Sequence, residues 1–168
     1  KEYLVVSTTD KGVFVYNTVK KKSTSVLLTA TAVVNKIKTT GKKSVLLATN
    51  KGLFKLNCSI KTTRQILKQQ ERKKNFKNVS DVYFEEEIGW LVCTRNKGLF
   101  VIEANGNVHH NTEDVFQKTA LLFNETNCIY KDVQGTFWIG SQRGLSSFNP
   151  LSKGIRGVGP SGDALKGM

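Results

Sequence analysis

Short apolar segments alternate with polar turns along the whole chain. The segments are four to six residues long and rich in β-branched and aromatic residues, with Gly, Asn, Asp, Ser or Lys at their ends. This pattern predicts β-strands. The predicted strands are 3–7, 12–16, 25–29, 44–49, 52–56, 79–84, 89–94, 98–102, 128–131, 136–141 and 144–148. Only 112–123 has some helical character, and we predict irregular structure there.

One strand–turn–strand motif occurs four times. An apolar strand is followed by a polar turn that contains Thr or Ser, and a basic residue and a glycine precede the next apolar segment. The four copies are 4–14, 45–54, 90–100 and 137–146. Their glycines, at 12, 52, 98 and 144, stand 40, 46 and 46 residues apart. A period of this length is typical of solenoids, arrays and propellers.

Related apolar segments precede three of the motif copies, at 33–37, 79–85 and 128–135. Each repeat then holds an inner strand, the motif hairpin and an outer strand, and four antiparallel strands per period make a propeller blade. We predict an all-β chain of about four blades. The repeats are approximately 1–30, 31–70, 71–118 and 119–152, and 153–168 is a glycine-rich tail or the start of a further blade.

The two ends of the chain indicate an incomplete ring. The first repeat begins at its second strand, and segment 154–163 is too rich in glycine to supply the missing inner strand. Lys1 in place of an initiating Met indicates an excised domain or a mature product. We therefore expect open edge strands that need a partner. No apolar run approaches the length of a membrane span, and no leader pattern opens the chain.

Basic residues dominate the charge. The chain has 26 Lys and Arg against 13 Asp and Glu, a net charge of +13. Such an excess favours polyanionic partners, or it serves only to keep the protein in solution. The basic residues are scattered and match no nucleic-acid-binding module, so we expect no nucleic-acid partner.

The residue types that carry catalysis or metal binding are sparse. The cysteines, Cys58, Cys93 and Cys128, occupy unequivalent repeat positions without a CxxC or Cys/His cluster, and we expect buried structural thiols. His109 and His110 point to opposite faces of one strand and make a poor metal pair. The run 85–87 of three Glu is expected to be a charged turn. With no nucleophile, phosphate-loop or zinc-protease motif, we expect no catalytic residue, metal or cofactor.

Residues 129–150 resemble the two-component regulator propeller repeat. That repeat runs D-x-x-G-x-h-W-h-G-T/S, a short turn, G-L, and an aromatic residue before Asn/Asp-Pro, where h is apolar. The matching residues are Asp132, Gly135, Trp138, Gly140, Ser141, Gly144, Leu145, Phe148 and Pro150. The other copies match at Thr49, Gly52 and Leu53, at Trp90, Thr94, Gly98 and Leu99, and at Thr8 and Gly12. The resemblance covers roughly 1–152.

The resemblance implies a periplasmic sensor region of a bacterial hybrid two-component receptor, in which a histidine kinase and a response regulator share one chain. Such receptors commonly sense carbohydrates and carry two seven-bladed propellers, an immunoglobulin-like domain and a membrane span. It follows that this chain is part of a seven-bladed propeller and that the rest of the receptor is its partner. A homodimer is a further possible assembly, and the membrane is reached only through other segments.

In the topology that the resemblance implies, the motif turns and the connections between blades share one face. The basic residue before each motif glycine and its polar neighbours would form an arc that suits hydroxyl-rich ligands. The candidate ligand-binding residues are Lys11, Asn50, Lys51, Arg95, Asn96, Lys97, Gln142 and Arg143, with Asp10 and 68–74 beside them. The alternative is that they are solvated turn residues. The basic clusters 20–22 and 42–43 fall on the opposite face and are expected to be solvated.

The aromatic residues are expected to serve packing rather than to stack on sugars. Trp90 and Trp138 lie on the motif strands, where the family packs its Trp between blades. Four phenylalanines are expected in the core: Phe14, Phe54, Phe100 and Phe148.

The sequence thus predicts a non-catalytic sensor segment that binds an oligosaccharide and regulates a histidine kinase elsewhere in the receptor. The basic charge favours an acidic or sulfated oligosaccharide. The alternatives are a protein-interaction or oligomerisation propeller and, with less support, a propeller lyase or hydrolase.

Overall fold

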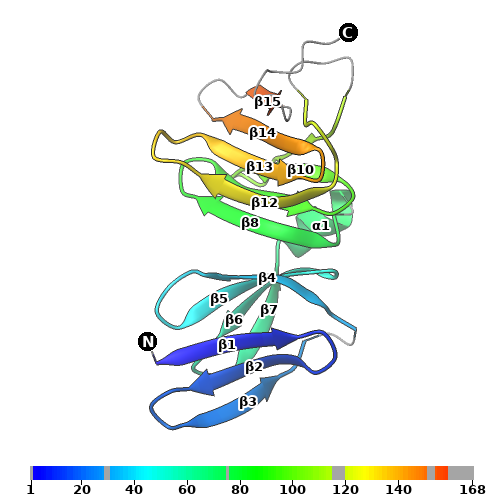
Figure 1. The fold of residues 1–168 in the computed structure, drawn as a ribbon. Helices are drawn as coiled ribbons and strands as arrows, with labels where there is room; N and C mark the ends of the chain where they lie inside the picture. Colours follow the sequence, from blue (N-terminus) through cyan, green and yellow to red (C-terminus); the bar gives the residue numbers. More distant parts are fainter. Residues whose placement is uncertain (1, 29–30, 75, 115–119, 151–153, 159–168) are drawn as a thin grey trace. The chain divides into compact units, whose positions relative to one another are not determined.

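The computed structural model describes residues 2–28, 31–74, 76–114, 120–150 and 154–158. The described residues form four antiparallel sheets, three with four strands and one with three (Figure 1). Strand order within each sheet follows chain order, as in propeller blades. The prediction of an all-β fold built from such blades is confirmed. The chain divides into two compact units, Lys1–Val79 and Ser80–Met168.

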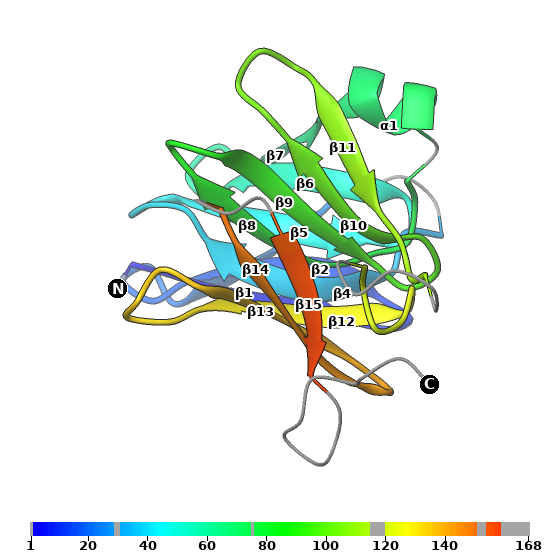
Figure 2. The ribbon, with the colours of Figure 1, turned by 90° about the horizontal axis from the view of Figure 1, so that it is seen from above.

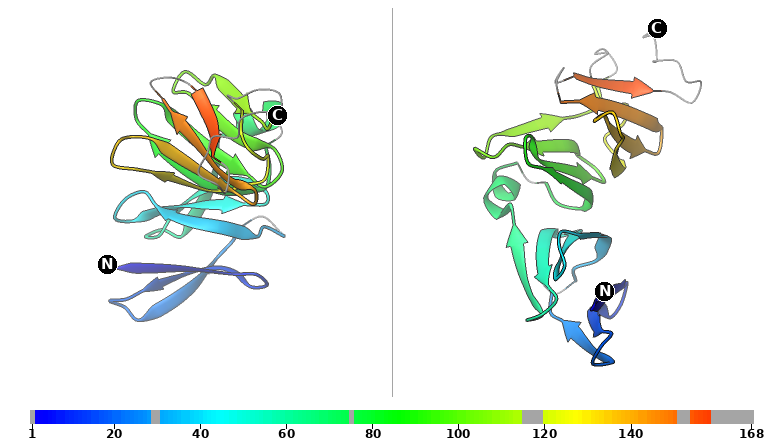
Figure 3. Two further views of the ribbon diagram at one scale, coloured as in Figure 1. Left: turned by 45° about the horizontal axis from the view of Figure 1, so that its top comes forward. Right: turned by 90° about the vertical axis from the view of Figure 1, so that its left-hand side faces the viewer.

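The first unit holds two sheets and a short helix (Figure 3). The first sheet consists of β1 (Tyr3–Thr8), β2 (Gly12–Asn17) and β3 (Lys22–Val26). The second consists of β4 (Val34–Thr39), β5 (Ser44–Thr49), β6 (Gly52–Asn57) and β7 (Thr62–Ile66), and α1 (Lys68–Lys74) follows it.

The second unit holds the other two sheets (Figure 2). The third sheet consists of β8 (Val79–Glu85), whose first residue belongs to the first unit, β9 (Gly89–Thr94), β10 (Gly98–Ile102) and β11 (Val108–Asn111). The fourth consists of β12 (Thr126–Lys131), β13 (Phe137–Ser141), β14 (Gly144–Asn149) and β15 (Gly154–Val158).

The outer strands are where sequence and structure differ. The strand predicted at 25–29 is wrong in position, because β3 is Lys22–Val26 and residue 29 lies outside the described residues. Strands β7, β11 and β15 carry few apolar residues, so their strand pattern is weak in the sequence. Strand β15 pairs with β14 and extends the fourth sheet past residue 152. Within 112–123, Glu113 and Leu121 form an isolated bridge, and 115–119 lie outside the described residues.

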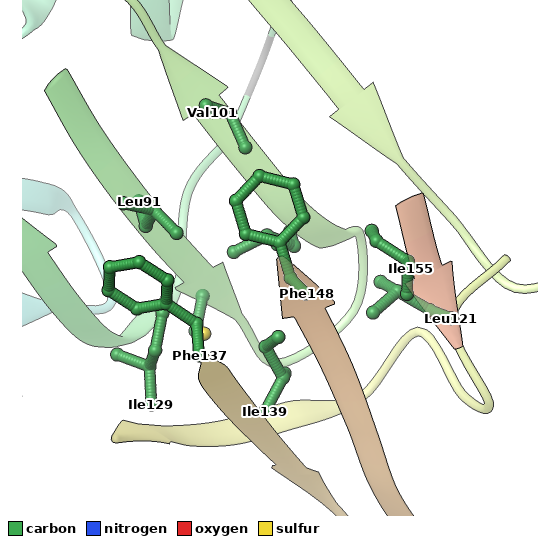
Figure 4. Close-up of a cluster of buried hydrophobic side chains, with 10 residues drawn as sticks. Leu91, Val101, Leu121, Ile129, Phe137, Ile139, Phe148 and Ile155 are labelled. Atoms are coloured by element: carbon green, nitrogen blue, oxygen red, sulfur yellow. The ribbon is translucent and has the colours of Figure 1, made fainter. Parts of the chain in front are cut away.

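Each unit buries apolar side chains between its two sheets. In the second unit, Leu91 and Val101 of the third sheet meet Ile129, Phe137 and Phe148 of the fourth (Figure 4). In the first unit, side chains of β1 and β2 pack against β5 and β6 in the same way. Because each such side chain contributes roughly 1.5–3 kcal/mol when buried, stacking of sheets is the main source of stability.

The predicted core aromatics are mostly buried. Phe54, Phe100 and Phe148 are buried as expected, whereas Phe14 is half-buried. Both tryptophans are half-buried, and the ring of Trp90 lies 4.7 Å from that of Phe84 in the same sheet.

The Asp and Trp of the fourth repeat contact each other directly. The indole Nε1 of Trp138 donates to Oδ2 of Asp132 over 2.8 Å. The other oxygen, Oδ1, accepts from the backbone N–H groups of Gln134 and Thr136, both at 2.9 Å. The Trp138 hydrogen bond, followed by the backbone hydrogen bonds, holds the pKa of Asp132 below its ordinary value. The D-x-x-G-x-h-W pattern is therefore a turn-closing contact.

A buried carboxylate links the inner strands of the third and fourth sheets. Asp81 on β8 accepts from its neighbour Val82 N at 2.8 Å through Oδ1 and from Ile129 N of β12 at 3.1 Å through Oδ2. Beside it, the hydroxyl of Ser80 donates to the carbonyl of Thr126 over 2.5 Å. The apolar stack is thus supplemented by polar contacts at its inner edge.

Two of the three cysteines follow the prediction. Cys58 and Cys93 are buried, and burial raises the pKa of the Cys58 thiol. Cys128 is exposed, so the prediction that it is buried is wrong. Its Sγ lies only 2.6 Å from where a Cβ at position 140 would be, so a side chain in place of Gly140 would require the Cys128 side chain to shift.

No helix among the described residues is both long and apolar enough to cross a membrane.

We predict that Asp81→Ala lowers the free energy of unfolding by about 2–4 kcal/mol. Two buried backbone N–H groups lose their acceptor, and each unsatisfied group costs roughly 1–3 kcal/mol. Urea denaturation measures the change. Glu86→Ala removes an equal charge from the exposed turn after β8 and is the matched control, expected within about 0.5 kcal/mol of the parent. Equal effects of the two changes would contradict this assignment.

We predict that protonation of Asp132 loosens the fourth repeat. Because its pKa is lower in the folded protein than in the unfolded chain, its stabilising effect is complete above the unfolded value of about 3.9. That effect is lost as the pH falls through the lower folded value. In a Trp90→Phe protein, Trp138 is the sole tryptophan, and its fluorescence should change below about pH 4. The same titration with Asp132→Asn added should lack this transition, and an unchanged transition would refute the contact's role.

Candidate ligand-binding turns

The four motif turns share one hydrogen-bond arrangement. The hydroxyl at the end of each strand accepts from the backbone N–H of the basic residue and donates to the glycine carbonyl. The N–H donors are Lys11, Lys51, Lys97 and Arg143, at 2.9, 3.0, 3.0 and 3.3 Å from the hydroxyls of Thr8, Thr49, Thr94 and Ser141. The carbonyl acceptors are Gly12, Gly52, Gly98 and Gly144, at 3.3, 2.7, 2.9 and 3.0 Å.

The glycine at the end of each turn has a positive φ, 74° at Gly98 and 131° at Gly144. This conformation disfavours residues with a Cβ, and at Gly98 and Gly144 the space for a Cβ is also closed, whereas at Gly12 it is open. A Cβ at Gly98 would lie 2.3 Å from the carbonyl oxygen of Asn111. Hydroxyl and glycine together therefore set the backbone position of the basic residue between them.

In the second and third sheets, a side chain of the outer strand also contacts the carbonyl of the basic residue in the turn. The side chain of Gln65 on β7 donates to the carbonyl of Lys51 over 3.4 Å. At the equivalent position of β11, Nε2 of His110 lies 2.5 Å from the carbonyl of Lys97. The His110 ring also stacks on Phe100, with ring centroids 4.1 Å apart.

The lysine side chains of these turns remain available to bind a ligand. Lys11 and Lys51 are exposed and Lys97 is half-buried. In the described part of the chain, none of the three ammonium groups has a carboxylate within ion-pair distance. The described carboxylates therefore do not neutralise the charges of these three lysines.

A pocket of about 260 Å³ lies beside Lys11 in the first unit. Its lining combines the charged pair Asp10 and Lys11 with hydroxyls of Thr9, Ser25 and Thr31 and with apolar Leu27 and Leu28. The remaining lining residues are Gly12, Val26, Ala32 and Val33. Charges, hydroxyls and an apolar surface are therefore present in one concave site.

Asn50, also predicted as a ligand residue, already has partners in the fold. Its Oδ1 accepts from Val33 N at 2.8 Å, and its Nδ2 donates to the Thr31 carbonyl over 3.2 Å. Because Thr31 and Val33 also line the pocket beside Lys11, Asn50 holds the backbone of two of the residues that line it.

In the second unit, Gln142 and Arg143 contact the connection that leads into β12. The Arg143 guanidinium lies 4.3 Å from the centre of the Phe123 ring, a cation–π contact. Gln142 Nε2 donates to Glu125 Oε1 over 3.2 Å. Sequence reasoning missed Phe123 and Glu125, since no motif places this connection against the turn.

Arg95 and Asn96 are exposed beside Lys97 in the third motif turn. The structure thus brings three candidate residues together in that turn. Lys11 and Lys51 belong to the first unit, and Lys97 and Arg143 to the second. The arc of all four basic residues stays a prediction.

The residues weighed for catalysis or metal binding are separated. His109 contacts Glu103 at 2.9 Å, whereas His110 contacts Phe100 and Lys97. The hydrogen bond with His109 lowers the pKa of Glu103. Glu85 pairs with Lys131 on β12 at 2.7 Å. The described residues contain no group of three or more His, Cys, Asp or Glu that could hold a metal ion.

Comparison with known sequences gives no relative: no protein-family model matches the chain, and no curated protein matches it.

Solved structures share its fold. Over 92% of its length the chain superposes on the extracellular domain of BT3049 from B. thetaiotaomicron, described as a hybrid two-component system, with a TM-score of 0.74 and 19% identity. Two structures of the extracellular domain of BT4673 from the same organism give TM-scores of 0.70 and 0.64, with 13% and 21% identity over 93% and 89% of the chain. The chain spans only 20–22% of the length of these three structures.

We predict that Thr94→Val destabilises the protein more than Thr8→Val. Thr94 is fully buried, so the loss of its hydroxyl leaves Lys97 N without its acceptor and leaves the Gly98 carbonyl with only the longer contact from the Thr126 hydroxyl, at 3.2 Å, which costs about 1–3 kcal/mol. Thr8 is half-buried, and water can replace its hydroxyl. Val is nearly isosteric with Thr, and thermal unfolding of each variant and of the parent protein measures the loss of stability. A larger loss for Thr8→Val would contradict the role given to the hydroxyl.

Proposed function

We propose that this chain is a non-catalytic, periplasmic sensor segment of a hybrid two-component receptor, which binds an oligosaccharide and thereby regulates a histidine kinase elsewhere in that receptor. The observation that carries the proposal is the shared fold, over nine-tenths of the chain, with extracellular domains of hybrid two-component systems. The repeat motif of residues 129–150 supports it independently, because the motif is a property of the sequence alone.

The pocket beside Lys11 supports an oligosaccharide as the ligand. Sugars present hydroxyl groups at their ring edges and C–H groups on their faces. Asp10 and Lys11 offer charged hydrogen-bonding partners for the hydroxyls, and Leu27 offers an apolar surface for a face. The candidate residues Lys51, Arg95, Asn96, Lys97, Gln142 and Arg143 would extend such contacts along the other motif turns.

Signalling requires that the ligand distinguishes two arrangements of the receptor. A ligand shifts such an equilibrium only by the difference between its affinities for the two arrangements. The motif turns suit this role, because their backbones are held by hydroxyls while their lysine side chains stay available. The kinase activity itself would reside outside this segment.

The rest of the receptor, including further propeller blades, is the proposed partner. Asn35 on β4 donates through Nδ2 to the carbonyl of Val79 at the start of β8 over 2.8 Å. Ser80 on β8 makes the corresponding contact one blade later, to the carbonyl of Thr126 at the start of β12. Asn127 holds the corresponding position on β12 and is exposed, so it could donate in the same way to the inner strand of a further blade.

An oligomerisation propeller is the second candidate. It is favoured by apolar side chains on the sheets that begin and end the chain. Leu4 is 55% exposed on β1, and Tyr130 is 64% exposed on β12. Light scattering over a concentration series distinguishes the candidates, since a pure sensor segment stays monomeric and an assembly module does not.

We predict that the purified protein binds oligosaccharides in a calorimetric screen of neutral and acidic glycans, and that Lys11→Ala weakens binding about tenfold. This factor corresponds to the loss of one hydrogen bond to a charged group. Lys20→Ala, an exposed change in the β2–β3 turn, is the matched control and should leave binding unchanged. Absence of glycan binding, or equal effects of the two changes, would refute the pocket assignment. Binding of neutral glycans alone, unaffected by salt, would refute the preference for acidic ones.

A further inference from the structure

A second concave site lies on the second sheet, on the strands β5, β6 and β7. Figure 1 shows the course of these strands. The site is a groove of about 490 Å³, larger than the pocket beside Lys11. Its lining residues are Lys43, Ser44, Lys55, Asn57, Ile60, Thr62 and Arg64. Three of these are cations and none is acidic. Lys43 stands just before β5, at the end of that strand opposite the motif turn, so the groove is distinct from the candidate turns.

Two of the cations repel each other within the sheet. Lys55 on β6 and Arg64 on β7 are direct cross-strand partners. Like charges at such positions destabilise a sheet. Both side chains are exposed, and neither has a carboxylate partner in the part of the chain that the structure describes. No contact within the sheet therefore accounts for this pair.

The other blades show what the repeat uses at this position. Lys55 is the third residue after its motif glycine, and its equivalents in the first and third sheets are Val15 and Val101. Both valines are buried, and each packs in the core between two sheets. Val15 is paired across the strands with uncharged Thr24. The corresponding pairs are Val101 with His109 in the third sheet and Ser147 with Arg156 in the fourth, so only the second of the four sheets places a Lys opposite an Arg at this position.

The polar neighbours in the groove are also arranged as donors. The side-chain oxygen of Asn57 accepts from Ser59 N at 2.9 Å and from Ile60 N at 3.4 Å. This leaves the Asn57 amide nitrogen to donate to a ligand. Ser44 and Thr62 add hydroxyls, and Ile60 adds an apolar side chain that is 67% exposed.

We propose that this groove binds the anionic groups, sulfate or carboxylate, of an acidic oligosaccharide. Lys55, Arg64 and Lys43 pair with the anions, Asn57 donates a hydrogen bond, and Ile60 contacts the sugar ring. The choice of a saccharide rather than another polyanion rests on the proposed sensor function. The anion-binding role of the groove rests on its own residues and does not require the pocket beside Lys11.

The test is calorimetric titration of the full chain with three probes of equal length: a dextran sulfate oligosaccharide, an oligogalacturonate and unsulfated dextran. The key variant is Lys55→Val/Arg64→Thr, which recreates the Val15–Thr24 pair of the first sheet. A second variant, Lys55→Gln/Arg64→Gln, keeps these positions polar in case the first fails to fold. The matched control is Lys20→Gln/Lys22→Gln, which removes two exposed charges from the first sheet and, like the others, lowers the net charge from +13 to +11.

The parent protein should bind at least one anionic probe with an affinity that falls as salt is added, and should bind unsulfated dextran less well. The groove variants should weaken anion binding at least tenfold, since two charged contacts are lost. The control should stay within about twofold of the parent, because charges far from a ligand are screened. Dextran sulfate and oligogalacturonate separate sulfate from carboxylate as the recognised group.

Four results would overturn the proposal: no anionic probe binds, dextran binds equally well, the groove variants bind like the parent, or the control loses as much affinity as they do. An oligothymidylate of equal charge is a further probe that tests the kind of polyanion, and its tighter binding would overturn the saccharide assignment. Failure of this site and failure of the proposed function are distinguishable. Lys11→Ala tests the turn pocket alone, and the groove variants leave that pocket intact.

Discussion

One hydroxyl per blade governs how this protein is built. The Thr or Ser that ends the second strand of each blade closes the motif turn by hydrogen bonding on both sides of the basic residue. In the third blade, Thr94 N also donates to the hydroxyl of Thr126 over 2.9 Å, which joins the turn to the fourth blade. The contact therefore shapes each hairpin and positions its basic residue, and in the third blade the same Thr also joins two neighbouring sheets. Because it involves only backbone groups and a small hydroxyl, the side chain of the basic residue takes no part in it.

Burial of apolar side chains between stacked sheets stabilises the fold, whereas these hydrogen bonds fix the geometry of its turns. A single blade leaves both faces of its sheet apolar, so it buries them only against a neighbour. Within each unit, apolar side chains such as Val15 and Phe137 meet this need. In the second sheet, Lys55 of β6 and Arg64 of the outer strand β7 are exposed and take no part in the apolar cluster of the first unit. Such exposed residues can change without loss of that cluster, and a repeat protein can thereby acquire binding sites on individual blades.

The repeat could be predicted from the sequence because the apolar strands and turn glycines that define it lie close together along the chain. The strands around Gly52 and Gly98 were predicted from apolar alternation and glycine turns, and all of their bounds agree within one residue. Strands β7 and β11 were missed because edge strands need little apolar content. Cys128 was expected to be buried but is exposed, since burial depends on which face of β12 it occupies. The candidate residues of the turns could be named in advance, but their contacts with Phe123, Glu125 and Val33 could not.

The sequence by itself determined the period, the blade and the position of a cation beside each motif glycine. Those features depend on backbone conformation and on neighbours only a few residues apart. Only the tertiary structure decided that the Asn50 side chain hydrogen-bonds to the connection that precedes its sheet and that Arg143 stacks on Phe123. It also decided that Lys43, Lys55 and Arg64 share one groove. These contacts join residues from different strands and loops. Their distances are set by strand register and sheet packing, which no single segment of the sequence encodes.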